Sequence, residues 1–429
     1  MKIRNFADIK SFFLDNRTLK QTIFKNTFWL AVAEVIQRGI GLLVVVWLAR
    51  YFGPGTYGKF AFALSFVLPF FVLADFGFST LSVRELARDK SKTAQYVDNI
   101  VAMKIILGLI TLGLISVIIQ FLGKEPEVVK LVYFLGIYVI IDTFATFFQS
   151  IFRANQKMQY ETICRVIQAF SLLGLAAFFI LNKRSIITIG YAYIGAVLIG
   201  ALFSLIFIWY YFSKFFLKIN LKICKEILLE AWPIALGGLF AIGYLRVGII
   251  ILSLMKTDQA VGWYNAAFEL VYAFAIIPSL FMFSVYPNLS IFFKESILKL
   301  KEVYEKSLKF IFLISIVLFP LLFLFSKEII LLLYGSAYLE TISAFKILLW
   351  AELFAFMSCV FLYTLIAINK QIIYAKVLGI CLTINIILCF ILIPRYSYVG
   401  LSVTTVVTEF LGSLLLFFYT KQNIVKLQA

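Results

Sequence analysis

The sequence has no histidine, and only 14% of its 429 residues are charged. A soluble domain usually carries about 25% charged residues, so this chain cannot form a water-compatible surface. The lack of histidine excludes histidine proton shuttles, histidine metal ligands and serine–histidine catalysis. The five cysteines are scattered without a CxxC pair, which indicates packing roles. We therefore expect no metal site and no cofactor.

Motifs of several enzyme classes are also missing. The sequence has no complete GxxxxGK[ST] phosphate-binding loop and no DxD acidic pair. The connections between its apolar runs are short, which leaves no room for a separate catalytic domain. We therefore expect a protein that is not an enzyme.

Apolar residues make up 63% of the chain and aromatic residues 17%. Because a spanning helix needs roughly 20 mostly apolar residues, runs of that length predict about twelve transmembrane helices. The predicted fold class is an all-α polytopic membrane protein. The predicted helices lie near residues 27–49, 60–83, 98–122, 129–152, 163–181, 188–212, 229–254, 262–291, 307–325, 341–367, 372–393 and 399–420.

Two shorter segments need a separate interpretation. In residues 1–26, apolar residues recur at helical spacing among Lys and Arg, which predicts either a helix on the cytoplasmic membrane surface or a disordered basic tail. The apolar run that follows is too long and too polar for a cleavable signal peptide, because it contains Glu34 and Arg38. The stretch 328–334 is apolar but too short to span, so we predict an interfacial or re-entrant segment.

The formal net charge is +17. The basic residues occur as short clusters between apolar runs, which is typical of cytoplasmic membrane loops and not of a nucleic-acid surface. We therefore expect no nucleic-acid partner. Placing the N-terminus in the cytoplasm assigns most of the 39 Lys and Arg to cytoplasmic segments. This bias predicts a multi-pass protein of the cell (cytoplasmic) membrane with both termini in the cytoplasm.

Similar segments recur in the same order in the two halves of the chain. Pro54–Ala63 resembles Asp258–Ala267, Ala154–Tyr160 resembles Ile368–Tyr374, and Gly190 matches Gly400. The similar offsets predict two pseudo-symmetric six-helix bundles around a central cavity. The predicted parts are the N-terminal segment 1–26, the N-lobe 27–212 with helices one to six, the basic cytoplasmic linker 213–228, the C-lobe 229–420 with helices seven to twelve, and the cytoplasmic tail 421–429.

The same segments carry a resemblance to a known family. They are the opening run from Asn26 to Gly58, Ala74–Ser79 with Arg84 and Glu85, Trp232–Pro233, Arg246, Val261–Ala267, Pro278 and Tyr286–Pro287. In these segments, and over nearly the whole chain, the sequence resembles the Wzx-like polysaccharide flippases of the multidrug/oligosaccharidyl-lipid/polysaccharide (MOP) exporter superfamily.

The resemblance implies a MATE-like fold of two six-helix lobes around a central cavity. It also implies transport of lipid-linked sugars across the cytoplasmic membrane. One position departs from the family pattern. Relatives often carry an acidic residue shortly after Arg246, whereas here Val247 and Gly248 follow it. The resemblance therefore does not imply an ion-coupling acid directly after Arg246.

Charged residues inside the predicted helices are the candidates for function, because each costs roughly 3 kcal/mol near a helix centre. We expect the basic ones to bind the pyrophosphate or acidic sugars of the substrate, since a guanidinium group binds phosphate oxygens bidentately. We expect acidic ones to bind H⁺ or Na⁺. The substrate-binding candidates are Arg38, Arg246 and Lys346, the ion-coupling candidates are Glu34, Asp75 and Glu269, and Asp142, Glu352 and Glu409 are further acids in predicted helices.

Structural roles stay open for several of these residues. Glu34 and Arg38 are four residues apart on one helix face, so they are able to pair and serve the fold alone. Asp75 lies near a helix end, where it can act as a cap. Glu269, Lys346 and Glu352 can sit at water-exposed helix ends. Arg246 is deepest in its helix and has no obvious local partner, so it is the strongest functional candidate.

The sequence therefore predicts a flippase that moves polyprenyl-diphosphate-linked oligosaccharide repeat units from the cytoplasmic to the outer leaflet by alternating access, coupled to H⁺ or Na⁺. Its expected partners are this lipid-linked oligosaccharide, membrane lipids, the coupling ion, a polysaccharide polymerase and glycosyltransferases. Two alternatives remain: a cation-coupled multidrug exporter of the MATE type, and a membrane enzyme acting on lipid-linked sugars.

Overall fold

The fold is described by a computed structural model over residues 18–211 and 218–428. Every regular element in these two stretches is a helix, so the all-α prediction is confirmed. Two short 3-10 turns, Lys90–Lys92 and Ser336–Tyr338, join longer helices. The α-helices are α2 (Leu19–Val67), α3 (Phe70–Asp75), α4 (Phe78–Arg88), α5 (Thr93–Phe121), α6 (Pro126–Ala154), α7 (Met158–Leu181), α8 (Ile187–Tyr211), α9 (Leu221–Met255), α10 (Asp258–Ala273), α11 (Ile276–Glu295), α12 (Ile297–Leu324), α13 (Ser326–Tyr334), α14 (Thr341–Ala367) and α15 (Gln371–Gln428).

Ten helical stretches of the described chain are long and apolar enough to cross a membrane. Two of them, Gln21–Arg88 with 68 residues and Gln371–Leu427 with 57, are much longer than one crossing needs. Each of these contains a residue with a non-helical backbone, Gly53 in the first and Ser397 in the second. The structure thus bears out a polytopic α-helical membrane protein, and the count of twelve helices stays a prediction.

Some predicted segments have other bounds in the structure. The surface helix predicted for the N-terminal segment falls largely on residues 1–17, which lie outside the described residues. The first part of the predicted linker 213–228 also lies outside them, and the remainder is helical because α9 begins at Leu221. The predicted tail is helical as well, since α15 continues to Gln428. Lys, Leu and Gln are good helix formers, so helices extend past their apolar runs. The stretch 328–334 lies in the nine-residue α13, which is too short to span.

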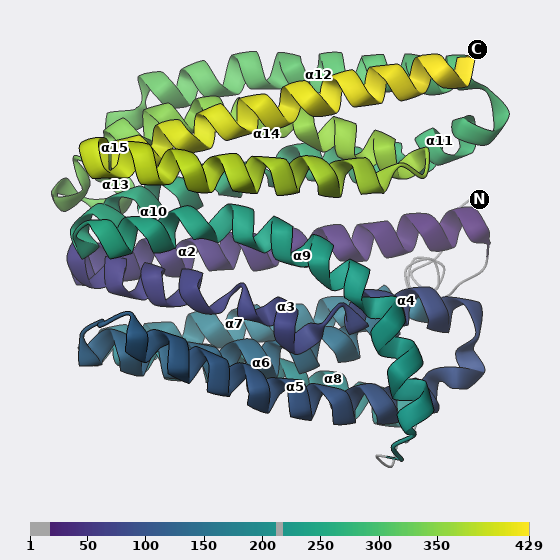
Figure 1. The fold of residues 1–429 in the computed structure, drawn as a ribbon, viewed down its shortest axis with the longest axis horizontal. Coiled ribbons are helices and arrows are strands. Elements are labelled where there is room, and N and C mark those ends of the chain that lie inside the picture. Colours follow the sequence, from purple (N-terminus) through teal and green to yellow (C-terminus); the bar gives the residue numbers. More distant parts are fainter. Residues whose placement is uncertain (1–17, 212–217, 429) are drawn as a thin grey trace, which may run out of the picture. The chain divides into compact units, whose positions relative to one another are not determined.

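The helices group into two compact units by their internal contacts. The first unit takes the chain up to Gly41 and Phe70–Gly238, and the second takes Leu42–Pro69 and the chain from Leu239 onward. Figure 1 shows α5 to α8 of the first unit side by side, and α12, α14 and α15 of the second unit likewise. The units divide within α2, between α2 and α3, and within α9, whereas the predicted lobes divide at the linker. The lobe boundaries therefore stay a prediction.

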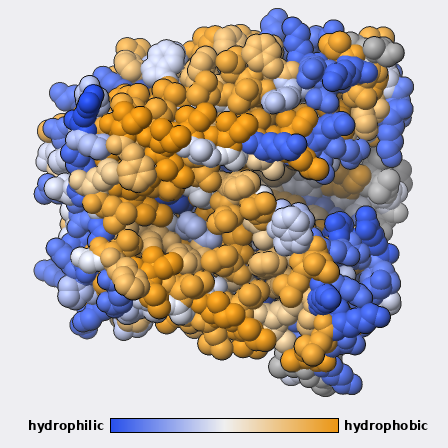
Figure 2. Space-filling model, viewed as in Figure 1, coloured by the Kyte–Doolittle hydropathy of each residue, from blue (hydrophilic) through white to orange (hydrophobic). Residues whose placement is uncertain are grey.

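The surface carries the composition expected for contact with lipid. On the face shown in Figure 2, apolar side chains cover the middle of the helices and hydrophilic ones gather near the helix ends. Large apolar side chains in both units are more than half exposed, among them Leu109 and Phe121 on α5 and Val317 on α12. A water-soluble protein rarely exposes so much contiguous apolar surface, so lipid must cover it.

Two glycines in the matched segments, Gly58 and Gly262, allow a close backbone contact between helices of the second unit. A Cβ atom added at Gly58 would lie 1.8 Å from the carbonyl oxygen of Asp258, and one added at Gly262 would lie 2.0 Å from that of Pro54. The contact is reciprocal, and its partners are the matched segments of the predicted repeat. Glycine is needed at both positions because a backbone atom, not a flexible side chain, occupies the space.

Replacing Gly262 by alanine is therefore expected to force these backbones apart and to lower stability by about 1–3 kcal/mol, the usual cost of overpacking. The measurement is the thermal unfolding midpoint of the detergent-purified protein. Gly113→Ala on α5 is the matched control, because a Cβ atom there meets nothing within 4 Å. Equal midpoints for the two variants would contradict the contact.

Candidate functional site

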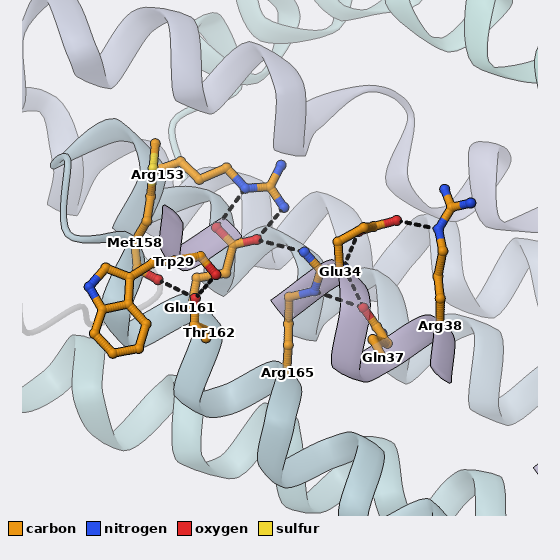
Figure 3. Close-up of polar contacts among 9 residues, drawn as sticks. All are labelled: Trp29, Glu34, Gln37, Arg38, Arg153, Met158, Glu161, Thr162 and Arg165. Carbon is orange, nitrogen blue, oxygen red and sulfur yellow. Dashed lines mark hydrogen bonds and ion pairs between the residues drawn. The ribbon is translucent and has the colours of Figure 1, made fainter. Parts of the chain in front are cut away.

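Charged side chains from α2, α6 and α7 form a continuous row of contacts in the first unit (Figure 3). Helix α2 supplies Glu34 and Arg38, α7 supplies Glu161 and Arg165, and Arg153 comes from the last turn of α6. Residues four apart lie on one face of a helix, so α2 and α7 each present an acid and a base toward the other. We call these five residues the arginine–glutamate row.

The α2 end of the row joins three residues. Arg38 Nε donates to Glu34 Oε1 at 2.6 Å, which confirms the pairing predicted from their spacing. The other carboxylate oxygen, Glu34 Oε2, accepts from Arg165 Nη2 at 2.8 Å. Arg165 also donates through Nε to Gln37 Oε1 at 2.8 Å. Glu34 is therefore held between an arginine on its own helix and one on α7.

The other end of the row is closed by a bidentate pair. Arg153 donates through Nε to Glu161 Oε2 at 2.7 Å and through Nη2 to Glu161 Oε1 at 2.6 Å. Arg165 Nη1 lies 3.7 Å from the same carboxylate. Glu161 is fully buried, and a buried carboxylate requires such compensation. Thr162 adds a hydrogen bond from its hydroxyl to the Trp29 carbonyl at 2.8 Å, tying α7 to α2.

The row alternates in sign and carries one net positive charge, because three arginines share two glutamates. The side chains of Arg38 and Arg153 at its two ends are 28% and 36% exposed and that of Glu34 is 24% exposed, whereas Glu161 is not exposed at all. An anion that contacts Arg38 can replace Glu34 there without leaving that carboxylate unpaired, since Glu34 keeps Arg165. The arrangement is suited to bind a phosphate and release it again.

Arg165 is the centre of the row, and its replacement by alanine is expected to lower stability by about 1–3 kcal/mol, the cost of charged hydrogen bonds lost. The loss stays moderate because each glutamate keeps one arginine. The measurement is the thermal unfolding midpoint in detergent. Arg184→Ala is the control, since Arg184 is exposed and forms no ion pair among the described residues. A drop no larger than that of the control would show that Arg165 does not bind the row together.

Asp75 occupies a different place in the first unit. It ends α3, and the two residues that separate α3 from α4, Phe76 and Gly77, have φ of 49° and 78°. The carboxylate accepts from Lys104 Nζ at 2.7 Å and from the Ser79 hydroxyl at 2.5 Å. Lys104 on α5 is completely buried. The structure thus joins the broken helix to α5 through a buried ion pair.

In the second unit, two sequence-predicted residues meet. Arg246 Nη1 on α9 donates to Glu269 Oε1 on α10 at 2.9 Å, and both side chains are mostly buried. The guanidinium carbon also lies 5.8 Å from the centroid of the Phe268 ring. Arg246 has no partner on its own helix among these contacts, in agreement with the sequence, and its partner Glu269 lies on the next helix.

Lys346 is not part of this pair. Its ammonium on α14 lies 4.9 Å from the centroid of the Phe323 ring on α12, and it makes no ion pair among the described residues. Two further acids from the sequence, Glu352 on α14 and Glu409 on α15, line one cavity of about 80 Å³ together with Phe268, Tyr272 and Thr405.

Sequence reasoning missed four of the charged residues that make these contacts. Arg153 and Glu161 were missed because they lie beside the short connection between α6 and α7, where charges are expected to face water. Arg165 lies inside the predicted helix 163–181, where its charge alone indicated the need for a partner. Lys104 stood inside a predicted helix, and its charge alone marked it as needing a partner. Which residue pairs with which depends on the packing of helices that are distant in sequence, so no spacing could identify these partners.

Helices of spanning length, lipid-compatible surfaces and ion pairs buried between helices define the chain as an all-α polytopic membrane protein. The family model described as "Polysaccharide biosynthesis protein" matches residues 23–293. The match covers more than half of the chain, so the protein belongs to the polysaccharide biosynthesis protein family. This confirms the resemblance found in the opening run and in the segments around Arg246.

Similar proteins extend over almost the full chain. The "Capsular polysaccharide biosynthesis protein CapF" of Staphylococcus aureus is 25% identical over 93% of this chain and 99% of its own length. The "Putative O-antigen transporter" of Escherichia coli (strain K12) is 22% identical over 95% of this chain and 98% of its own.

Solved structures share the fold. The lipid II flippase MurJ in an inward closed conformation superimposes with a TM-score of 0.74 at 18% identity, covering 92% of this chain and 89% of that one. A MOP superfamily transporter from Pyrococcus furiosus gives a TM-score of 0.66 at 16% identity, with 98% of each chain covered. At these identities the likeness concerns the fold alone.

Proposed function

We propose that this protein is a transporter, not an enzyme, and that it flips polyprenyl-diphosphate-linked oligosaccharide repeat units from the cytoplasmic to the outer leaflet by alternating access. The family model is described as a polysaccharide biosynthesis protein. Two relatives that match over almost their full length are named as a capsular polysaccharide biosynthesis protein and a putative O-antigen transporter. The proposed setting is the cytoplasmic membrane with both chain ends in the cytoplasm. A polysaccharide polymerase and glycosyltransferases are the proposed protein partners.

The observation that carries the proposal is the pairing of arginine with glutamate inside spanning helices of both units. Arg38 pairs with Glu34 in the first unit, and Arg246 pairs with Glu269 in the second. A guanidinium that exchanges its carboxylate for a phosphate keeps its charge compensated throughout. A substrate with a diphosphate supplies the oxygens that such planar groups bind.

A protein path for the sugars is physically necessary. Moving one unpaired hydroxyl group from water into hydrocarbon costs roughly 4–8 kcal/mol, and an oligosaccharide carries many hydroxyl groups. Spontaneous flipping is therefore negligible. The polyprenyl tail can remain in lipid, so only the polar part of the molecule needs the protein.

Coupling follows from the same pairs. When phosphate replaces Glu269 at Arg246, the released carboxylate is left in a poorly solvated place, and it is stabilised by taking up H⁺ or Na⁺. At Arg38 the exchange leaves Glu34 with Arg165 as its remaining cation, so Glu34 requires the ion less than Glu269 does. Asp75 was the third predicted coupling acid, but Lys104 and Ser79 already occupy its carboxylate. We therefore assign coupling to Glu34 and Glu269 and a fold-stabilising role to Asp75.

One observation favours the drug-exporter alternative. Glu352 and Glu409 line a small cavity with the aromatic rings of Phe268 and Tyr272. Carboxylates and ring faces together attract organic cations. Its small volume of about 80 Å³ argues against a drug-sized ligand, since such pockets typically measure about 300–1,000 Å³.

The test is translocation in proteoliposomes. A labelled polyprenyl-diphosphate oligosaccharide is placed in one leaflet, and its appearance in the other is followed with and without an H⁺ or Na⁺ gradient. Protein-dependent translocation that responds to a gradient is the expected result. Efflux of small organic cations without movement of the lipid-linked sugar would support the drug exporter instead, and release of a chemically altered sugar would identify an enzyme.

A further inference from the structure

An apolar groove runs along the second unit between α12, α14 and α15. Figure 1 shows the C-terminal part of α15 beside α12, with α14 next to both. The groove encloses about 540 Å³. Most of its lining residues are aromatic or aliphatic, and Ser413 is the one uncharged polar residue among those that line it. The apolar wall is formed by Phe312, Phe354, Met357, Phe361, Phe410 and Phe417.

One end of the groove is charged. A second hollow of about 390 Å³ shares Glu305, Leu308 and Phe417 with the groove, and Lys301 and Lys421 lie in its wall. Lys309 lines the groove itself. Lys301 Nζ and Glu305 Oε1 are 4.0 Å apart. The two adjoining hollows together are lined by three lysines and one carboxylate. A single phosphate can be bound there while Glu305 stays with Lys301.

The two parts form one continuous surface by helix geometry. On α12, Lys301, Glu305, Leu308 and Phe312 follow each other at spacings of three and four, so they share one face. On α15, Phe410, Leu414, Phe417 and Lys421 do the same. The Lys421 ammonium lies 5.9 Å from the Phe417 ring centroid, where the apolar wall meets the charged end.

We propose that this groove binds one anionic glycerophospholipid, with the phosphate among Lys301, Lys309 and Lys421 and an acyl chain along the phenylalanine wall. The lysines next to the apolar wall favour an anionic lipid over a free phosphate. The lysine side chains are accessible to water, so without the apolar wall they would bind a free phosphate only weakly. An amphiphilic lipid binds more tightly, because its phosphate contacts the lysines while its acyl chain contacts the phenylalanines. Basic pockets between membrane helices are known to hold anionic lipid head groups.

The position of the groove agrees with this ligand. The N-terminal half of α12 carries Lys301 and Lys309, and the C-terminal end of α15 carries Lys421. The phenylalanines of the wall follow toward the middle of both helices. A phospholipid has the same order, a phosphate at the membrane surface and a chain toward its centre. In the proposed orientation this end faces the cytoplasm, whose leaflet is rich in anionic lipid. The inference does not depend on which sugar the protein carries.

The test is native mass spectrometry of the detergent-purified protein titrated with phosphatidylglycerol or with phosphatidylcholine of the same chains. We expect at least one phosphatidylglycerol to bind more tightly than phosphatidylcholine. Substituting Lys301→Gln, Lys309→Gln and Lys421→Gln together should weaken that binding at least about tenfold. Leu414→Trp, which fills the groove without a change of charge, should weaken both lipids.

The matched control keeps the same helices and the same loss of charge. Lys299→Gln, Lys306→Gln and Lys426→Gln lie on α12 and α15 but do not line the groove. This triple variant should bind phosphatidylglycerol normally. Equal weakening in both triple variants would reduce the effect to diffuse surface charge and overturn the site. Unchanged binding in Leu414→Trp, or displacement of phosphatidylglycerol by an equal amount of polyprenyl phosphate, would also overturn it.

Discussion

Replacing Arg246 by alanine is expected to reduce translocation of the lipid-linked oligosaccharide roughly 10- to 150-fold. Hydrogen bonds to charged groups are worth about 1.5–3 kcal/mol, and each 1.4 kcal/mol is a factor of ten. Arg246 is mostly buried and paired with Glu269 at 2.9 Å, so substrate must compete for its guanidinium inside the protein. The measurement is the initial rate in proteoliposomes at matched protein density.

A second variant separates the effect of Arg246→Ala on folding from its effect on translocation. Arg246→Ala alone leaves Glu269 without its arginine, which can destabilise the protein. The double variant Arg246→Ala with Glu269→Gln removes both charges, and it should fold yet still fail to translocate. Arg246→Lys should be intermediate, because lysine keeps the charge but loses the planar fork. Normal rates in the double variant would make Arg246 a structural residue and refute its role in substrate binding.

Replacing Glu269 by glutamine tests the coupling step separately. A glutamine at position 269 is neutral, so it needs no H⁺ or Na⁺ when the substrate phosphate binds the Arg246 guanidinium. Translocation down the substrate gradient should then persist, while its acceleration by an H⁺ or Na⁺ gradient should disappear. An unchanged response to the gradient would move the coupling site elsewhere, with Glu34 as the next residue to test.

Replacing Lys104 by alanine should give the largest loss of stability among these variants, about 3–5 kcal/mol, because it leaves Asp75 buried without its cation. Lys104 is completely buried and only 2.7 Å from Asp75. The loss should appear as a lower thermal unfolding midpoint and a smaller folded fraction in size-exclusion chromatography. Lys130→Ala on α6 is the control, since Lys130 is exposed.

Removing both charges identifies the cause. The variant Lys104→Met with Asp75→Asn contains no buried charge, and Ser79 can still donate to the amide oxygen at position 75. It should recover most of the lost stability, because a buried ion pair replaced as a whole is often neutral in cost. If the double variant were as unstable as Lys104→Ala, the unpaired charge of Asp75 would not be the cause of the loss.

The site could be predicted only in part. The Glu34–Arg38 pair followed from their spacing of four residues, because one helix alone fixes that geometry. The pairs Arg246–Glu269, Lys104–Asp75 and Arg165–Glu34 join different helices, and the last is separated by 131 positions. The sequence showed that these charges needed partners, but it could not choose them.

The sequence by itself determined the all-α membrane class, because only lipid can solvate so apolar a chain and only helices satisfy its backbone there. It also predicted an internal repeat, since segments in the two halves carry matched residues. Tertiary structure decided the rest: which helices break, where the two units divide, and which arginine meets which glutamate. These depend on side-chain packing between helices, where glycines such as Gly58 and Gly262 set the approach and neighbouring faces select the ion pairs.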